Sequence, residues 1–164
     1  MTTDLKLRAS VSYLEEAIQA SIDSGETEST IDESILTHHF TPPMEDYGGA
    51  RLYARECSVP AGMIFTGKLH RHPHIVSLIK GKMAVVSEGG RKVVSAPSTW
   101  AAPSGSKRAF YAIEDSVLLN VHITNIEDET DLDKLEEEVI APSYSSIGLE
   151  EPNYTLLGED LWLL

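Results

Sequence analysis

Cysteine is nearly absent from this sequence of 164 residues, which has Cys57 and no other. A single cysteine excludes a disulfide within the chain, so the fold must depend on a buried apolar core, which a chain of this length can form. Low cysteine usage is compatible with a reducing compartment, and we expect a cytoplasmic protein. No catalytic context surrounds Cys57, so we expect a small apolar core residue rather than a nucleophile.

Long hydrophobic runs are lacking as well. No stretch approaches the roughly 18 apolar residues that a membrane span requires. The first residues, Met1 to Leu5, carry no apolar segment of the kind found in secretion signals. We therefore expect neither a membrane partner nor secretion. The sequence also shows no internal repeat, no phosphate-binding glycine loop and no Ser-His-Asp arrangement.

Positive charge is scarce and confined to the middle of the chain. Residues 1–50 carry two Lys/Arg against ten Asp/Glu (net −8), residues 51–124 carry ten against four (net +6), and residues 125–164 carry one against twelve (net −11). The overall charge of −13 argues against nucleic acid as a partner. Two interpretations of the basic middle remain open: it binds something anionic, or the acidic arms fold onto it.

The two arms each predict one helix. In the N-terminal arm, 1–49, apolar residues from Leu7 to Ile22 recur at helical spacing, with Leu14 and Ile18 on the same stripe. Ser12 and Glu15 resemble a capping box, and Ser24-Gly25 supplies a stop. In the C-terminal arm, 125–164, an acidic helix is predicted over Asp131 to Val139. The apolar end, Leu161 to Leu164, is costly to expose to water, so we expect this tail to dock.

The central segment, 50–124, has the pattern of an all-β domain. Short runs rich in Val, Ile, Leu and aromatic residues alternate with turn signals such as Pro60-Ala61-Gly62, Glu88-Gly89-Gly90 and Pro103-Ser104-Gly105. Many short strands at roughly ten-residue spacing predict a sandwich or barrel. The last strand, Val117 to Thr124, is almost wholly apolar, as a buried strand would be.

Within this segment the spacing of glycines and prolines resembles the two motifs of the cupin superfamily, G-x5-H-x-H-x3,4-E-x6-G and G-x5-P-x-G-x2-H-x3-N. Gly62, positions 68, 70 and 74, and Gly81 reproduce the first spacing, and Pro103, Gly105 and position 108 reproduce part of the second. The resemblance covers about 60 residues and implies a single double-stranded β-helix, or jelly-roll, barrel. The chain is also similar to small uncharacterised cupin-like proteins of bacteriophage and bacterial genomes.

The positions that bind metal in the family are partly replaced here. The first histidine position is Lys68, the glutamate position is His74 and the second-motif histidine is Arg108, whereas His70 is retained. Position 112, an asparagine in the family, is Ala112, and Pro97 stands for the leading glycine of the second motif.

Other histidines offer replacements for the lost ligands. Alternate residues of a strand share a face, so His70, His72 and His74 would all point inward if the strand stays regular across Pro73. His122, on the final strand, is the fourth candidate. Such an all-histidine shell suits a divalent transition metal such as Zn, Fe, Ni, Cu or Mn. His38 and His39 precede a proline loop, and we expect both to be exposed and outside the barrel.

Three further residues are candidates for binding a small anion. Lys68 and Arg108 stand where the family places metal ligands, and two cations beside a metal require an intervening negative charge. Tyr111, on a flanking strand, could donate a hydrogen bond inside the barrel. The alternative is that Lys68 and Arg108 leave the barrel and pair with the acidic arms.

Two classes of function follow from these patterns. One is a metal-binding barrel that holds a small anionic molecule, with catalysis undecided. The other is a non-catalytic structural or assembly protein, such as a bacteriophage virion or accessory component, for which the arms provide contacts. In either case we expect a homo-oligomer, because barrel edges and apolar helix stripes favour association.

Overall fold

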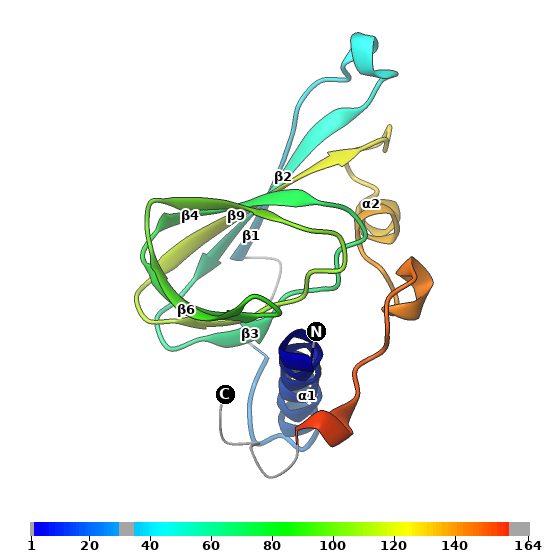
Figure 1. The fold of residues 1–164 in the computed structure, drawn as a ribbon. Helices are drawn as coiled ribbons and strands as arrows, with labels where there is room; N and C mark the ends of the chain where they lie inside the picture. Colours follow the sequence, from blue (N-terminus) through cyan, green and yellow to red (C-terminus); the bar gives the residue numbers. More distant parts are fainter. Residues whose placement is uncertain (1, 30–34, 158–164) are drawn as a thin grey trace.

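The computed structural model describes residues 2–29 and 35–157. Its centre is a barrel made of two antiparallel sheets (Figure 1). The predicted docking of Leu161 to Leu164 concerns positions outside the described residues.

The strand order is that of a jelly roll with one added strand. The first sheet has the order β1-β2-β9-β4-β7 and the second the order β3-β8-β5-β6. The bounds are β1 Leu36–Phe40, β2 Arg51–Val59, β3 Ile64–Thr66, β4 His74–Lys80, β5 Lys82–Ser87, β6 Gly90–Ser95, β7 Ser98–Ala102, β8 Ala109–Ala112 and β9 Ser116–Thr124. From β2 on, consecutive strands cross between the sheets except for the hairpin β5-β6, as in double-sheet jelly rolls, which include the cupins. The predicted all-β barrel is therefore confirmed.

Strand β1 extends the barrel beyond the predicted segment. It pairs along its whole length with β2, from Leu36 opposite Cys57 to Phe40 opposite Tyr53. The sheet thus begins before residue 50, and His38 belongs to it. The sequence of β1, Leu-Thr-His-His-Phe, is largely polar, so it does not reveal the alternation of half-buried and exposed side chains that the structure shows. The segment forms a strand because it pairs with β2.

The core lies between the sheets and follows from alternation along the strands. Val76 and Leu78 of β4 and Met83 and Val85 of β5 are almost completely buried, and Leu118 of β9 joins them. Residues between these positions face outward, because successive side chains of a strand point to opposite sides.

Helix α1 (Thr2–Asp23) packs on the outside of the barrel beside β3 and β5 (Figure 1). The N-terminal helix was predicted, but its start was not: Ser12 lies inside the helix, so the resemblance to a capping box was wrong. The predicted stop is confirmed at Gly25, where φ is 76° and the backbone N–H donates to Ile22 O. Val11 is buried, and Leu14, Ile18 and Ile22 are half-buried.

Helix α2 (Leu132–Val139) lies at one open end of the barrel (Figure 1). Asp131 caps its N-terminus by accepting a hydrogen bond from Lys134 N. Leu135 and Val139 form the buried face and pack with Tyr53 and Ile126. The remaining helical turns are η2 (Glu45–Tyr47), η3 (Ser145–Ile147) and η4 (Tyr154–Leu156). Among the described residues no helix is long and apolar enough to cross a membrane.

Ion pairs join the acidic arms to the basic barrel. Glu15 of α1 pairs with Lys107, Glu129 pairs with Arg51, and Glu136 of α2 pairs with Lys68. In one further pair the arm supplies the cation and the barrel the acid: Arg8 of α1 is buried, and its Nε donates to Glu88 at 2.6 Å. The interpretation that the arms fold onto the barrel therefore holds for these residues.

Candidate metal centre

Three histidines converge at the open end of the barrel that α2 covers. His122 on β9 lies opposite Tyr53 of β2, and His74 begins β4 one position before Ile75, which lies opposite Val121. The register thus places His74 beside His122 on the inner face. His70 lies on an extended segment before β4 that is held by a single bridge to Ile140 and by a hydrogen bond from Gly105 N to His70 O at 2.8 Å.

The three rings form a compact group. The ring centroids are 4.1 Å apart for His70 and His74, 4.6 Å for His74 and His122, and 5.1 Å for His70 and His122. One nitrogen of each ring lies within 4.8 Å of the corresponding nitrogens of the other two. All three residues are buried, with 4–6% of their surface exposed.

The Nε2 atoms of His70, His74 and His122 are buried and have no hydrogen-bond partner. Most buried polar atoms in proteins have a partner, so three orphaned nitrogens in one group require an explanation. The second nitrogen of His74 does have a partner: Nδ1 lies 3.3 Å from the carbonyl oxygen of His72. Such a contact fixes the ring orientation and leaves Nε2 available as a ligand atom.

Burial keeps these rings neutral. It lowers the pKa of His70 from 6.5 to about 2, that of His122 to about 3 and that of His74 to about 4. The charges of the neighbouring histidines add to the effect at His70 and His122. A neutral imidazole is the form that binds metals, so the group fits a divalent transition metal in composition, protonation and unsatisfied donor atoms.

His72 lies outside this group. The expected regular strand through Pro73 does not form, because β4 begins only at His74 and residues 71 and 72 form a bend. His72 is exposed as a result, and the described candidate ligand group consists of the other three histidines. Proline fixes φ and lacks an N–H, which explains the interruption of alternation at this point.

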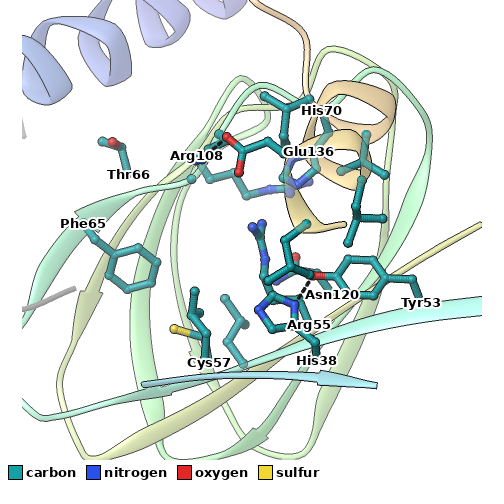
Figure 2. A pocket seen from close by; sticks show the side chains of 18 of the residues that line it. His38, Tyr53, Arg55, Cys57, Phe65, Thr66, His70, Arg108, Asn120 and Glu136 are labelled. Atoms are coloured by element: carbon teal, nitrogen blue, oxygen red, sulfur yellow. Dashed lines mark hydrogen bonds and ion pairs between the residues drawn. The ribbon is translucent and has the colours of Figure 1, made fainter. Parts of the chain in front are cut away.

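A cavity of about 360 Å³ extends from His70 into the barrel (Figure 2). Its wall on the first sheet consists of three cross-strand rows. The row at the open end contributes Tyr53, whose cross-strand neighbour His122 does not itself line the cavity. The middle row pairs His38, Arg55 and Asn120, and the innermost row pairs Leu36, Cys57 and Leu118. The second sheet adds Phe65 and Phe110, and α2 adds Leu135, Glu136 and Val139.

The three predicted anion-binding residues lie in different places. Arg108 is buried and lines the cavity close to His70 (Figure 2). Lys68 is half-exposed at the rim and forms an ion pair with Glu136 of α2, as the alternative interpretation predicted. Tyr111 points outward on β8, is 43% exposed and is not among the residues that line the cavity, so its expected position inside the barrel was wrong.

Sequence reasoning missed three cavity residues: Arg55, Asn120 and His38. The signal for two of them was present, because Tyr53-x-Arg55-x-Cys57 and Leu118-x-Asn120-x-His122 place a polar residue on an inward face between buried positions. His38 was expected to be exposed and outside the barrel, but it is half-buried and its Nδ1 lies 2.8 Å from Tyr53 Oη. Burial raises the pKa of Tyr53 to about 12, so the phenol stays protonated.

Comparisons with known proteins find likeness in structure only. No family model matches the sequence, and a search of the curated proteins gives no match. Similar solved structures include KdgF from Halomonas sp. (20% identity, 64% of this chain and 94% of that chain, TM-score 0.43), ectoine synthase from P. lautus (17%, 65% and 75%, TM-score 0.45) and a cupin-2 domain containing protein from Shewanella frigidimarina (10%, 54% and 80%, TM-score 0.40). We call the barrel cupin-like because of its own strand order, and these neighbours assign it neither a metal nor a reaction.

Proposed function

We propose that this protein is a cupin-like metal-binding protein that holds a divalent transition metal through His70, His74 and His122. The observation that carries the proposal is a group of three buried histidines whose Nε2 atoms lack partners and whose rings each place one nitrogen within 4.8 Å of the others. Without an ion, burying these nitrogens costs free energy, because each has lost its hydrogen bond to water.

The donor set limits the choice of metal and leaves room for a ligand. Three imidazoles suit Zn, Fe, Ni, Cu or Mn, and they would leave at least one coordination position for water or a ligand. When bound, such an ion supplies a Lewis-acid centre. The residues of the chain orient and enclose the site: His72 O contacts the His74 ring, and α2 with Leu135 and Val139 restricts access from solvent.

A small anionic molecule is the proposed second occupant of the cavity. Arg108 supports this part of the proposal, because it is buried at the cavity wall near the histidines. We propose no reaction. The His38–Tyr53 pair is the one arrangement typical of a general base among the described residues that line the cavity.

Elemental analysis tests the metal assignment. Protein purified without an affinity tag and without added metal is expected to contain about one transition-metal ion per chain. The double variant His70→Ala/His74→Ala is expected to contain none while keeping the circular dichroism spectrum of a β barrel. A metal content that the double substitution leaves unchanged would exclude the site.

A role in assembly is the second candidate function. It is favoured by apolar side chains on the outer face of the second sheet, where Ile64, Tyr111 and Val93 are 43–59% exposed. A structural protein uses such a face for contacts with other copies or partners, and it needs no metal for that purpose.

A further inference from the structure

We propose that the molecule held in the cavity is an organic carboxylate with a small apolar body, and that Arg55 and Arg108 together bind its carboxylate group. The inference rests on the proposed function for its location beside the metal centre. It goes further in naming Arg55, whose place in the cavity was not expected from the sequence, and in defining the chemical class of the ligand.

The side chains of Arg55 and Arg108 both line the cavity. Figure 2 shows Arg55 extending from β2 into the middle of the cavity and Arg108 entering it near His70. In the part of the chain that the structure describes, no hydrogen bond or ion pair involves either guanidinium. Three other arginines do have partners: Arg8 pairs with Glu88, Arg51 with Glu129, and Arg71 donates to Ile140 O.

Enclosed cations without partners are costly. A guanidinium has five N–H donors and cannot lose its charge at physiological pH, so it requires an acceptor when water is removed. Burial lowers the pKa of Arg108, because it removes water from the charged guanidinium. Arg55 extends into the same cavity from β2, so two positive charges share this space.

The charges around the cavity favour an anion over a neutral ligand. Lys68 is already paired with Glu136, and among the other described residues that line the cavity the cations Arg55 and Arg108 outnumber the one acid, Asp133. A divalent ion at the histidines would increase the positive charge further, and the repulsion between like charges would oppose metal binding. An anion between the arginines and the metal removes this repulsion and accepts hydrogen bonds from both guanidinium groups.

The apolar row behind the arginines defines the body of the ligand. In the register of β1, β2 and β9, the middle row containing Arg55 and Asn120 lies between the histidine row and the row of Leu36, Cys57 and Leu118. Phe65 and Phe110 face the same region from the second sheet, stacked with ring centroids 4.9 Å apart. A molecule with a charged end at the arginines thus extends its other end among apolar side chains.

Two further polar groups can complete the site for the charged end. Ser106 Oγ is buried and has no hydrogen-bond partner, and the Asn120 side chain lines the cavity opposite Arg55 in the register. The apolar surroundings and the volume of about 360 Å³ fit a small carboxylate better than a phosphate ester, whose dianion needs a more polar cradle.

Calorimetric titration of the metal-loaded protein with benzoate, and with its uncharged isostere benzamide, tests the inference. Benzoate is expected to bind at least tenfold more tightly than benzamide, which corresponds to about 1.4 kcal/mol. It is also expected to bind more tightly than acetate, which has the charge without the body. Arg55→Gln and Arg108→Gln are each expected to weaken benzoate binding at least tenfold and to leave benzamide unchanged.

Arg51→Gln is the matched control, because Arg51 lies on the same strand as Arg55 but pairs with Glu129 outside the cavity. It is expected to bind benzoate as the wild type does. A second readout separates binding from structure: removing an unpaired guanidinium should leave Tm unchanged or raise it, whereas removing a structural arginine lowers it.

The possible results distinguish this inference from the proposed function. If the wild type contains its metal but binds no benzoate, or binds inorganic phosphate more tightly than any carboxylate, the ligand class is wrong and the metal site stands. If Arg55→Gln and Arg108→Gln lower Tm without weakening benzoate binding, both arginines are structural. If metal is absent and benzoate still binds in an Arg55-dependent way, the carboxylate site stands and the metal site falls.

Discussion

The metal assignment depends on one nitrogen atom in each of three histidine rings. His70, His74 and His122 are buried beside one another with Nε2 atoms that have no partner. His72, two residues from either neighbour in sequence, is exposed. We expect His122→Ala to reduce the metal content of the purified protein by at least tenfold and His72→Ala to leave it unchanged. Elemental analysis of the two variants decides the ligand set, and metal loss in His72→Ala alone would reverse the assignment.

The same histidines should make the metal-free protein sensitive to acid. In the unfolded chain each has a pKa near 6.5, but burial lowers the native values to about 2, 4 and 3 for His70, His74 and His122. The unfolded state therefore binds protons first as the pH falls. Each group reduces the free energy of unfolding by up to about 1.4 kcal/mol per pH unit below pH 6.5.

Denaturant titrations of chelator-treated protein between pH 7.5 and pH 5 would measure this loss. Stability is expected to be highest above pH 6.5 and to decrease steadily below it, down toward the native pKa values. The variant His122→Gln should show a smaller decrease, since it lacks one of the three protonation sites. A free energy of unfolding that is constant over this range would contradict the burial of neutral histidines.

How far the sequence predicted these residues depends on strand alternation. His70 and His74 followed from motif spacing, and His122 followed from its place on an apolar strand. His72 was misjudged because alternation stops at Pro73, and Tyr111 because nothing in a short strand marks which face is inward. Arg55 went unnoticed because an inward arginine contradicts the usual rule that such residues are exposed. Polar residues on inward faces are where patterns fail and binding sites occur.

Among the elements, the turn between β4 and β5 shows why one motif glycine is required. Gly81 has φ of 83°, and a Cβ at this position would lie 2.3 Å from Ser116 Oγ and 2.4 Å from Asp115 O. Gly90 also has a positive φ, 108°, but a Cβ there would meet nothing within 4 Å. We expect Gly81→Ala to lower the free energy of unfolding by about 3 kcal/mol or more, from strain and overlap together.

Gly90→Ala is the control for strain alone, with an expected cost of about 1 kcal/mol. Urea denaturation of both variants gives the comparison. Equal costs would show that the contact with Ser116 is relieved without penalty and that backbone conformation alone selects glycine at position 81.

Element boundaries were predicted where turn residues mark them and missed where tertiary contacts decide. Turn signals containing glycine and proline predicted a series of strands between Arg51 and Thr124. Ser24-Gly25 predicted where α1 stops. The start of α1 was not predicted, because the apolar stripe begins at Leu7 whereas the helix begins at Thr2. Strand β1 was missed altogether, since its residues Leu36–Phe40 read as polar and form a strand through pairing with β2.

For the whole molecule, the segregation of charge has a structural explanation. Acidic residues of both arms lie on the basic barrel, as the pairs Glu15–Lys107 and Glu136–Lys68 show. Exposed pairs of this kind each contribute little to stability, about 0–1 kcal/mol. These pairs neutralise Lys107 and Lys68, whereas Arg55 and Arg108 line the cavity without an ion-pair partner among the described residues.

Self-association is the remaining prediction at this scale, and the outer face of the second sheet is where we expect it. Ile64 lies opposite Tyr111, Tyr111 opposite Ala84, and Ala84 opposite Val93, so these residues form one apolar row across β3, β8, β5 and β6. A second copy that placed the same row against this one would bury Ile64 and Val93, which are 51% and 59% exposed. Two-fold contacts of this kind are the commonest form of homo-oligomer.

The expected result is a dimer mass in light scattering that becomes monomeric in the variant Ile64→Lys/Val93→Lys, because the two-fold contact would then oppose like charges. Ile123→Lys is the control, since Ile123 is 64% exposed but lies on the other sheet. It should leave the dimer intact. A monomer mass for the wild type over a wide concentration range would rule out association, and a dimer that survives the double substitution but not Ile123→Lys would move the interface to the first sheet.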